Sequence, residues 1–351
     1  VRRHEPQYFQ RTATVLLPKD YLRYRMTGKK VSDMSDAAGT LWLDVAKRDW
    51  SDSLLDKCGL SRSQMPTLVE GCEVSATLDP QVAERWGLNA SVAVAGGGGD
   101  NAVSAIGVGA VSPGDAFISL GTSGVLFVVT DAYRPAPQSA VHAFCHVLPN
   151  LWHQMSVMLS AASCLQWFCR LTGTTEVALL EEIAQLSEEE KAHAPFFLPY
   201  LSGERTPHND PDARGMFWGM THSSLRAQLG YAVLEGVSFG INDGLRVLKE
   251  SGTRIEQCSL VGGGARSPFW AQLLADILDM PVVTHKGGET GGALGAARLA
   301  CLAAGKPLAA VCEKPEVWQT WRADPVRHQT LMRRYAQFNA LYLNDLNYRQ
   351  H

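Results

Sequence analysis

Several common functional signatures are absent from this sequence, and each absence excludes a class of protein. No run of about 18 apolar residues occurs, so no membrane-spanning helix is expected. The formal net charge of -3 offers no positive field to a nucleic acid backbone. The G-x-x-x-x-G-K-[ST] pattern is missing, and no G-x-G-x-x-G opens a strand–helix unit. We therefore expect no contact with membranes or nucleic acids, no P-loop kinase and no dinucleotide enzyme.

The cysteines form no C-x-x-C pair. All eight are scattered along the chain, which favours reduced core thiols in a cytoplasmic protein over a disulfide framework or a zinc site. His142 and His146 lie four residues apart, but no third ligand with metal spacing accompanies them. The sequence therefore predicts no metal-binding residue.

Length and patterning indicate an α/β protein with two domains. The 351 residues suffice for two domains, and the 46% hydrophobic content is that of a globular chain. Short β-rich runs occur with long helical patterns, which favours an α/β architecture. We place a boundary near 110–113, between domains of residues 1–111 and 112–351. Strands are expected at 14–17, 92–95, 116–120, 125–129 and 258–264, and long helices at 155–172, 176–187, 224–250, 268–279 and 290–304.

A glycine turn precedes a helix expected to begin near Asp100. The buried run 92–95 leads into four glycines, 96–99, followed by Asp100 and Asn101. Glycines let a ligand approach the backbone, and a carboxylate at a helix start lies beside unpaired N–H groups. Asp100 could accept the proton of a substrate hydroxyl while Asn101 binds a neighbouring hydroxyl. Alternatively, Asp100 only caps the helix, although four glycines exceed what a cap needs.

A second turn, Gly121–Gly124, joins two β-rich runs and predicts a hairpin. Its residues Gly121, Thr122 and Ser123 present N–H and O–H donors, which can bind phosphate oxygens without a lysine. An ordinary hairpin turn is the alternative.

A third turn follows the strand expected at 258–264. Gly263, Gly264 and Ala265 could lie flat against a purine and ribose, with a phosphate near the start of the next helix. A tight strand–helix connection without a ligand is the alternative.

Two further glycine patterns indicate structure rather than chemistry. Gly287-Gly288 and Gly291–Ala297 place small residues at helical spacing, which indicates close helix packing. Gly236–Gly240 matches the G-x-S-x-G hydrolase pattern, but it falls within a helical stretch and not at a strand-to-helix elbow. A serine hydrolase is therefore not expected.

Taken together, these motifs resemble those of the FGGY family of carbohydrate kinases. Residues 98–101 look like the catalytic-base segment of that family, 118–124 like its second phosphate loop, 261–265 like its adenosine motif and 215–220 like its C-terminal signature. The resemblance covers nearly the whole chain, and the motifs stand in the family's order. Segments 16–22, 32–40 and 198–208 are most similar to the branch of the family that acts on xylulose.

The resemblance implies a fold, a reaction and its ligands. The fold would be the actin-like ATPase, ribonuclease-H-like fold, with two lobes, a cleft between them and the first lobe incomplete. Residues 1–111 would be the remainder of a sugar-binding domain, and 112–351 a nucleotide-binding domain. Asp100 would deprotonate the 5-hydroxyl of D-xylulose, with Asn101 also at the substrate, and the oxygen would attack the γ-phosphate of ATP. The turn 121–123 would hold phosphates, 263–265 would touch adenosine, and Mg²⁺ would offset the phosphate charge. The partners would be the sugar and ATP, and a homodimer is compatible with the sequence.

Three features depart from the family pattern. No D-x-G-T-S-like phosphate loop lies upstream, a sugar-binding Met-His pair is absent, and Ser267-Pro268 stands where some relatives carry Asn. From the family's layout we expect roughly 130 further residues before Val1 and little turnover from this chain alone. Two alternatives remain: a kinase for gluconate, ribulose or glycerol, and a non-catalytic relative that binds sugar or nucleotide.

Overall fold

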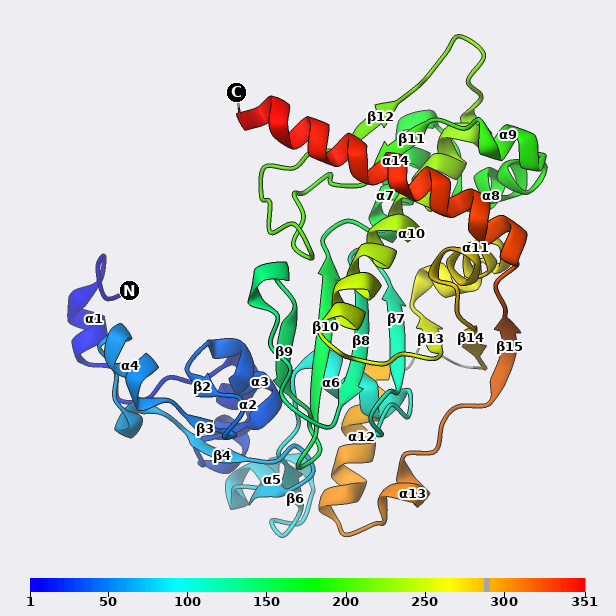
Figure 1. The fold of residues 1–351 in the computed structure, drawn as a ribbon. Coiled ribbons are helices and arrows are strands. Elements are labelled where there is room, and N and C mark those ends of the chain that lie inside the picture. The colour runs from blue at the N-terminus through cyan, green and yellow to red at the C-terminus, as the bar shows by residue number, and fades with distance from the viewer. Residues whose placement is uncertain (287–290, 351) are drawn as a thin grey trace.

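A seven-stranded mixed sheet forms the centre of the molecule, and the computed structural model describes residues 1–286 and 291–350 (Figure 1). The strand order is β15-β14-β13-β7-β8-β10-β9. Strands β7, β8, β10 and β9 are antiparallel neighbours, with β10 inserted between β8 and β9. Strands β13 and β14 continue the sheet in parallel with β7, and β15 is antiparallel at the edge. The strands are β7 (Ala116–Leu120), β8 (Gly124–Thr130), β9 (His142–Cys145), β10 (Trp152–Met158), β13 (Cys258–Val261), β14 (Val282–His285) and β15 (Val317–Trp321).

Both faces of the central strands of this sheet are buried, and their side chains alternate between two cores. In β7, Ile118 and Leu120 face one core while Phe117 faces the other. In β8, Val128 joins the first core and Phe127 stacks on Phe117 in the second, with ring centroids 4.8 Å apart. The alternation follows from the two-residue period of a strand, and burial on both sides explains the continuous apolar runs in the sequence.

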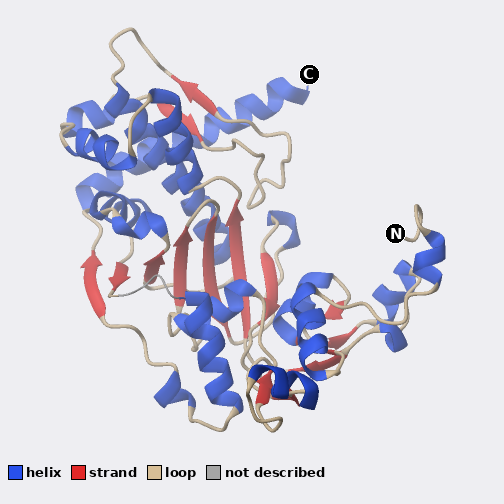
Figure 2. Ribbon diagram, turned by 180° about the vertical axis from the view of Figure 1, so that it is seen from behind, coloured by secondary structure: helices blue, strands red, loops and turns tan. Residues whose placement is uncertain are grey.

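Helices cover the two faces as separate layers. Figure 1 shows the larger layer over the upper part of the sheet, and Figure 2 shows the smaller layer from behind. The larger layer contains α7 (Ala162–Thr172), α8 (Glu176–Ala184), α9 (Glu188–Ala192), α10 (Arg226–Glu250), α11 (Pro268–Leu278) and α14 (Pro325–Gln350), together with the hairpin of β11 (Phe196–Leu198) and β12 (Met216–Trp218). The smaller layer contains α6 (Asp100–Gly107), α12 (Gly291–Ala303) and α13 (Leu308–Val311).

The first hundred residues form short elements beside the sheet rather than part of it. Strand β1 pairs with β4, β2 with β3, and β5 with β6, each as a separate two-stranded ladder. The elements are α1 (Pro6–Gln10), α2 (Pro18–Thr27), α3 (Met34–Ala37), α4 (Asp52–Cys58), α5 (Pro80–Trp86), β1 (Val31–Asp33), β2 (Leu43–Asp44), β3 (Asp49–Trp50), β4 (Thr67–Val69), β5 (Val74–Thr77) and β6 (Ala93–Ala95). In Figure 1, α1 lies beside α4, and both lie away from the central sheet.

Two predictions of secondary structure were wrong. Residues 14–17 form no strand; they are extended chain held by a bond from the Val15 N–H to the Gln64 carbonyl. The helix predicted from residue 155 begins only at Ala162, because residues 152–158 form β10 in the middle of the sheet. The other long helices and the strands of the 116–129 hairpin were predicted correctly to within a few residues.

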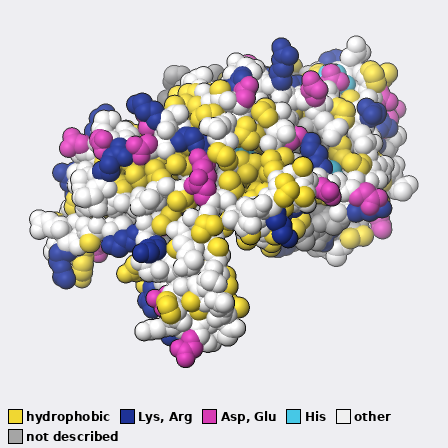
Figure 3. Space-filling model, turned by 90° about the horizontal axis from the view of Figure 1, so that it is seen from below, with side chains coloured by type: hydrophobic (Ala, Val, Ile, Leu, Met, Phe, Trp, Pro, Cys, Tyr) yellow, Lys and Arg dark blue, Asp and Glu magenta, His cyan; other side chains and the backbone are white. Residues whose placement is uncertain are grey.

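The surface and the cysteines complete the description. Figure 3 views the molecule from the side of α12 and α13 and shows apolar side chains gathered over the middle of this face, with charged side chains around them.

All eight cysteines are unpaired. Five of them are buried, but Cys58 is exposed, so the prediction of core thiols was wrong there. Each helix among residues 1–286 and 291–350 is too short or too polar to cross a membrane.

Candidate active site

Two of the four glycines before Asp100 are required by packing, and a third by its backbone conformation. A Cβ on Gly96 would lie 2.2 Å from the Glu70 carbonyl oxygen, and one on Gly98 would lie 2.3 Å from a methyl of Val147. Gly97 has φ +73, which side chains rarely tolerate. A Cβ on Gly99 would meet nothing closer than 3.5 Å. The glycine run therefore lets this turn fit against its neighbours, and its length is not by itself evidence of a ligand.

Asp100 is the first residue of α6, and its carboxylate is exposed. The N-cap of the helix is Gly99, so the interpretation of Asp100 as a cap was wrong. Oδ1 of Asp100 accepts hydrogen bonds from the Asn101 backbone N–H at 2.7 Å and from the Asn101 side-chain amide at 3.1 Å. A carboxylate at the first turn of a helix is stabilised by the helix dipole. The side chain therefore stays accessible to a ligand hydroxyl, with Asn101 directly beside it.

The turn between β7 and β8 is held in place by its backbone and exposes its hydroxyl groups. The Gly121 N–H donates to the Ser123 carbonyl at 3.1 Å. The Thr122 carbonyl accepts from the Ala161 N–H at 2.9 Å, which fixes the turn against the start of α7. Thr122 and Ser123 are both exposed. The predicted hairpin is confirmed, and its small polar residues face solvent.

The third turn lies directly beside the second. Because β13 runs parallel to β7, with Val261 opposite Ser119, both turns emerge at the same edge of the sheet. Gly262 has φ +88, and Leu120 packs so tightly here that a Cβ on Gly264 would lie 2.4 Å from its Cδ2. Gly263 has open space around its Cα. The structure thus brings together two of the three predicted ligand turns, at the carboxyl ends of parallel strands, where α/β sheets commonly bind ligands.

No hydrogen bond or ion pair links Asp100 to either turn within the described part of the chain. Asp100 instead begins α6, which belongs to the smaller of the two helical layers. In that layer Ala105 packs in the same core as Phe117 and Phe127. This helix contacts α12 through glycine: a Cβ on Gly295 would lie 1.9 Å from the Val103 carbonyl oxygen. The prediction of close helix packing for 291–297 is confirmed, whereas Gly287 and Gly288 lie outside the described residues.

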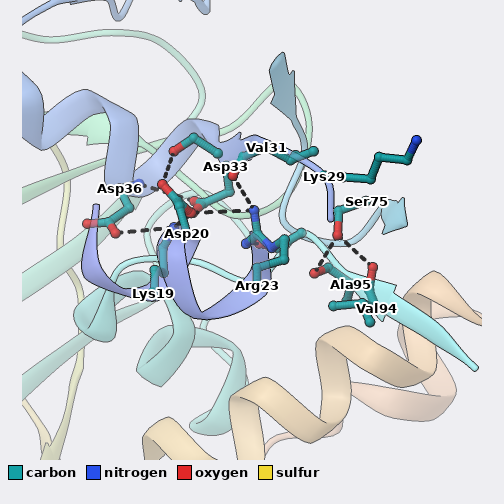
Figure 4. A network of polar contacts seen from close by, with 12 residues as sticks. Lys19, Asp20, Arg23, Lys29, Val31, Asp33, Asp36, Ser75, Val94 and Ala95 are labelled. Atoms are coloured by element: carbon teal, nitrogen blue, oxygen red, sulfur yellow. Dashed lines mark hydrogen bonds and ion pairs between the residues drawn. The ribbon is translucent and has the colours of Figure 1, made fainter. Parts of the chain in front are cut away.

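A polar network behind the glycine turn was missed by the sequence analysis (Figure 4). Lys19 Nζ lies 2.6 Å from Asp20 Oδ1, 2.6 Å from Asp33 Oδ1 and 3.2 Å from Asp36 Oδ2. Arg23 donates to the Val31 carbonyl at 2.8 Å and also to the Gly96 carbonyl. The sequence signal was weak, because Asp33 and Asp36 lie more than ten residues after Lys19 and Asp20 and no short motif joins positions so far apart.

Burial and ion pairing shift the pKa values of Asp36 and Lys19 in this network. Asp36 is half-buried, and loss of solvation raises the pKa of its carboxyl group despite the nearby ammonium of Lys19. The pKa of Lys19 is raised: burial opposes the charged form, but the carboxylates of Asp33 and Asp20 outweigh this effect. The Lys19 ammonium therefore remains charged and offsets part of the negative charge that gathers behind Asp100.

Two other features, the G-x-S-x-G pattern and a hollow between helices, lie apart from the predicted site residues. Ser238, in the G-x-S-x-G pattern, is buried inside α10, where its hydroxyl donates to the Leu234 carbonyl at 2.8 Å. A hollow of about 450 Å³ lies between α9, α11 and α14, and Phe269 and Leu331 form part of its wall. None of the predicted site residues lines this hollow.

The chain belongs to the FGGY family of carbohydrate kinases and has the actin-like, ribonuclease-H-like fold of that family. Residues 1–107 match the N-terminal domain of the family, and residues 116–304 match the C-terminal domain. It is similar to the xylulose kinase of Escherichia coli strain K12, with 52% identity over 97% of this chain and 71% of that protein. A xylulose kinase of Klebsiella pneumoniae is 53% identical over 86% of this chain and 62% of its own length.

Solved structures of relatives agree with the fold. A structure described as a xyloylose kinase from Brucella ovis superimposes with a TM-score of 0.94 at 48% identity, over 99% of this chain and 72% of that one. A gluconate kinase from Lactobacillus acidophilus superimposes with a TM-score of 0.88 at 25% identity, over 99% and 70%. This chain thus spans about seven tenths of the length of these two solved relatives.

Proposed function

We propose that this carbohydrate kinase transfers the γ-phosphate of ATP to the 5-hydroxyl of D-xylulose. The choice of D-xylulose as the substrate rests on 52% identity to a xylulose kinase over 97% of the chain. The gluconate kinase has the same fold, but its 25% identity gives weaker support to gluconate as the acceptor.

In this proposal, Asp100 is the general base. Its exposed carboxylate accepts the proton of the 5-hydroxyl as that oxygen attacks the γ-phosphorus, and the bond to the β-phosphate oxygen breaks to release ADP. Asn101, which already donates to Asp100, orients a neighbouring hydroxyl of the sugar. The products are D-xylulose 5-phosphate and ADP, and the proton remains on Asp100 until it passes to solvent.

The two adjacent turns are the proposed nucleotide site. The turn of Gly121, Thr122 and Ser123 binds the phosphates through the N–H and hydroxyl groups of its two exposed residues. The open backbone at Gly263, followed by Gly264 and Ala265, lies against adenosine. The described residues contain no group of three or more His, Cys, Asp or Glu side chains suited to a metal. This fits a Mg²⁺ ion carried mainly by ATP, since Mg²⁺ usually takes one or two carboxylates together with phosphates and water. When bound, the ion offsets phosphate charge.

The remaining proposals concern the division into domains and the location of the enzyme in the cell. We place the division between a sugar-binding and a nucleotide-binding domain at residues 1–111 and 112–351. Closure of the cleft between these domains would exclude water from the reaction. We also propose that the enzyme acts in the cytoplasm, which is consistent with eight unpaired cysteines.

A coupled assay with a panel of sugars tests the substrate. D-Xylulose should give the highest kcat/KM among D-xylulose, gluconate, ribulose and glycerol, measured with the protein encoded by the complete gene. Equal or better turnover of gluconate would reject the proposed substrate. Absence of turnover with every sugar, together with retained ATP binding, would favour a non-catalytic relative.

Replacing the base tests the mechanism. Asp100→Ala should lower kcat by at least about 100-fold, the usual contribution of a positioned base, while ATP binding measured by calorimetry stays near the wild-type value. Asp79→Ala is the matched control, because Asp79 also lies at a helix start, where its carboxylate accepts from the Gln81 N–H at 2.9 Å. A normal kcat in Asp100→Ala would show that another group takes the proton.

A further inference from the structure

The backbone N–H immediately before Asp100 is bound by a side chain from a distant segment. Ser35 lies in α3, is only 3% exposed, and its hydroxyl oxygen accepts a hydrogen bond from the Gly99 N–H at 3.0 Å. A Cβ on Gly98 would lie 2.9 Å from the same oxygen, so Ser35 is packed against two successive residues of the turn. This contact joins segments 64 residues apart in the sequence.

The orientation of the Ser35 hydroxyl group is fixed from behind. A hydroxyl has one hydrogen, and here it is donated to Asp33 Oδ2, which leaves the lone pairs of the oxygen for Gly99. Asp33 is fully buried, and the same Oδ2 accepts from the backbone N–H of Ser35 at 2.9 Å and of Asp36 at 3.1 Å. Its other oxygen is paired with Lys19. The acceptor for Gly99 is therefore held by a continuous chain of charged and neutral hydrogen bonds.

We propose that Ser35 is a positioning residue for the reaction, which holds the Gly99–Asp100 peptide so that the Asp100 carboxylate points to the substrate hydroxyl. The inference rests on the proposed role of Asp100 as base. A run of four glycines has few side-chain contacts of its own, so an external bond to its last N–H limits the freedom of the residue that follows. Catalytic groups have to be held to within roughly 0.5 Å, and a displacement of about 1 Å can cost 100-fold in rate.

The same network contains a matched control for Ser35. Ser32 is 1% exposed, and its hydroxyl donates to the buried carboxylate of Asp20 at 2.7 Å. Ser32→Ala thus removes a buried hydroxyl–carboxylate bond of the same kind as Ser35→Ala does, but no hydrogen bond joins Ser32 to the glycine turn within the described residues. Both variants should lose thermal stability, and Ser35→Ala should lose more because the Gly99 N–H also loses its acceptor.

Turnover separates a positioning role from a structural one. Ser35→Ala should lower kcat for D-xylulose by about 10- to 100-fold and leave KM for ATP unchanged, because the turns at 121–124 and 262–266 are untouched. Ser32→Ala should keep the kcat of the wild type. Equal kcat values in the two variants would overturn the inference.

Amide hydrogen exchange tests the contact without relying on activity. The Gly99 amide should exchange faster in Ser35→Ala than in Ser32→Ala, and unchanged Gly99 exchange would overturn the positioning inference alone. If the wild type encoded by the complete gene phosphorylated no sugar, the proposed function would be overturned and the catalytic role of Ser35 with it, whereas faster Gly99 exchange in Ser35→Ala would still establish the contact. Should Ser35→Ala not fold, Ser35→Cys is the second variant, because sulfur occupies the same place but accepts hydrogen bonds weakly. It should also speed Gly99 exchange, and a wild-type exchange rate would contradict the inference.

Discussion

The four glycines before Asp100 should respond very differently to the same substitution. Gly96→Ala places its Cβ 2.2 Å from a backbone oxygen that cannot rotate away, so we expect a loss of at least about 3 kcal/mol in unfolding free energy. Gly98→Ala meets a buried side chain, Val147, and should lose about 1–3 kcal/mol. Gly97→Ala should lose roughly 1–2 kcal/mol, because its φ of +73 strains any residue with a Cβ.

Gly99→Ala is the internal control of this series. Its φ of -62 suits any residue, and the nearest atom to a new Cβ lies 3.5 Å away. Alanine lowers the conformational entropy of the unfolded chain, but it is less favourable than glycine at the N-cap of α6. The two effects oppose each other, so the unfolding free energy should change by less than about 1 kcal/mol. Urea unfolding at one pH measures all four variants. Losses of similar size at Gly98 and Gly99 would refute the view that packing, and not chain flexibility, requires the glycines.

Two predictions concern buried charge away from the site. Burial raises the pKa of Glu204 to about 7, above the ordinary 4.5, so the folded state binds the proton more tightly and stability falls as pH rises between these values, by about 3 kcal/mol at most. Glu204→Gln should flatten the unfolding free energy between pH 4.5 and 7, and an unchanged slope would contradict this assignment. Arg334→Met should cost about 3–5 kcal/mol in chemical denaturation, since Arg334 pairs with the buried Glu235 at 2.7 Å. The double variant Arg334→Met/Glu235→Met should recover most of the lost unfolding free energy, because no buried charge is left unpaired. Equal losses in the single and double variants would contradict the view that an unpaired Glu235 carboxylate causes the loss.

The sequence predicted those parts of the fold whose signal is local. The hairpin at 116–130 has β-rich runs on both sides of a small-residue turn, and α10 has a helical pattern along its whole length. Residues 155–158 were misassigned because β10 is buried on both faces and shows no alternation of apolar and polar residues. Thr14–Leu17 is rich in β-formers, yet it lies at the margin of the molecule without a strand to pair with.

The candidate site was predictable as separate motifs but not as an arrangement. Asp100 and the two turns proposed to bind phosphate and adenosine were predicted from glycines next to polar residues. The pairing of β7 with β13 explains why the two turns are adjacent. The role of Ser35 could not be predicted, because a hydrogen bond to Gly99 across 64 residues leaves no local pattern. The glycine count was misinterpreted, since packing partners such as Val147 come from a different part of the chain.

The glycine contact between α6 and α12 has a consequence for how the molecule can move. Where backbone touches backbone, at Gly107 against Gly291 and at Gly295 against Val103, no flexible side chain is present to absorb sliding. The helix that bears Asp100 must then travel with α12 and the central sheet as one body. We expect any closure of the molecule to leave the contact between these two helices intact.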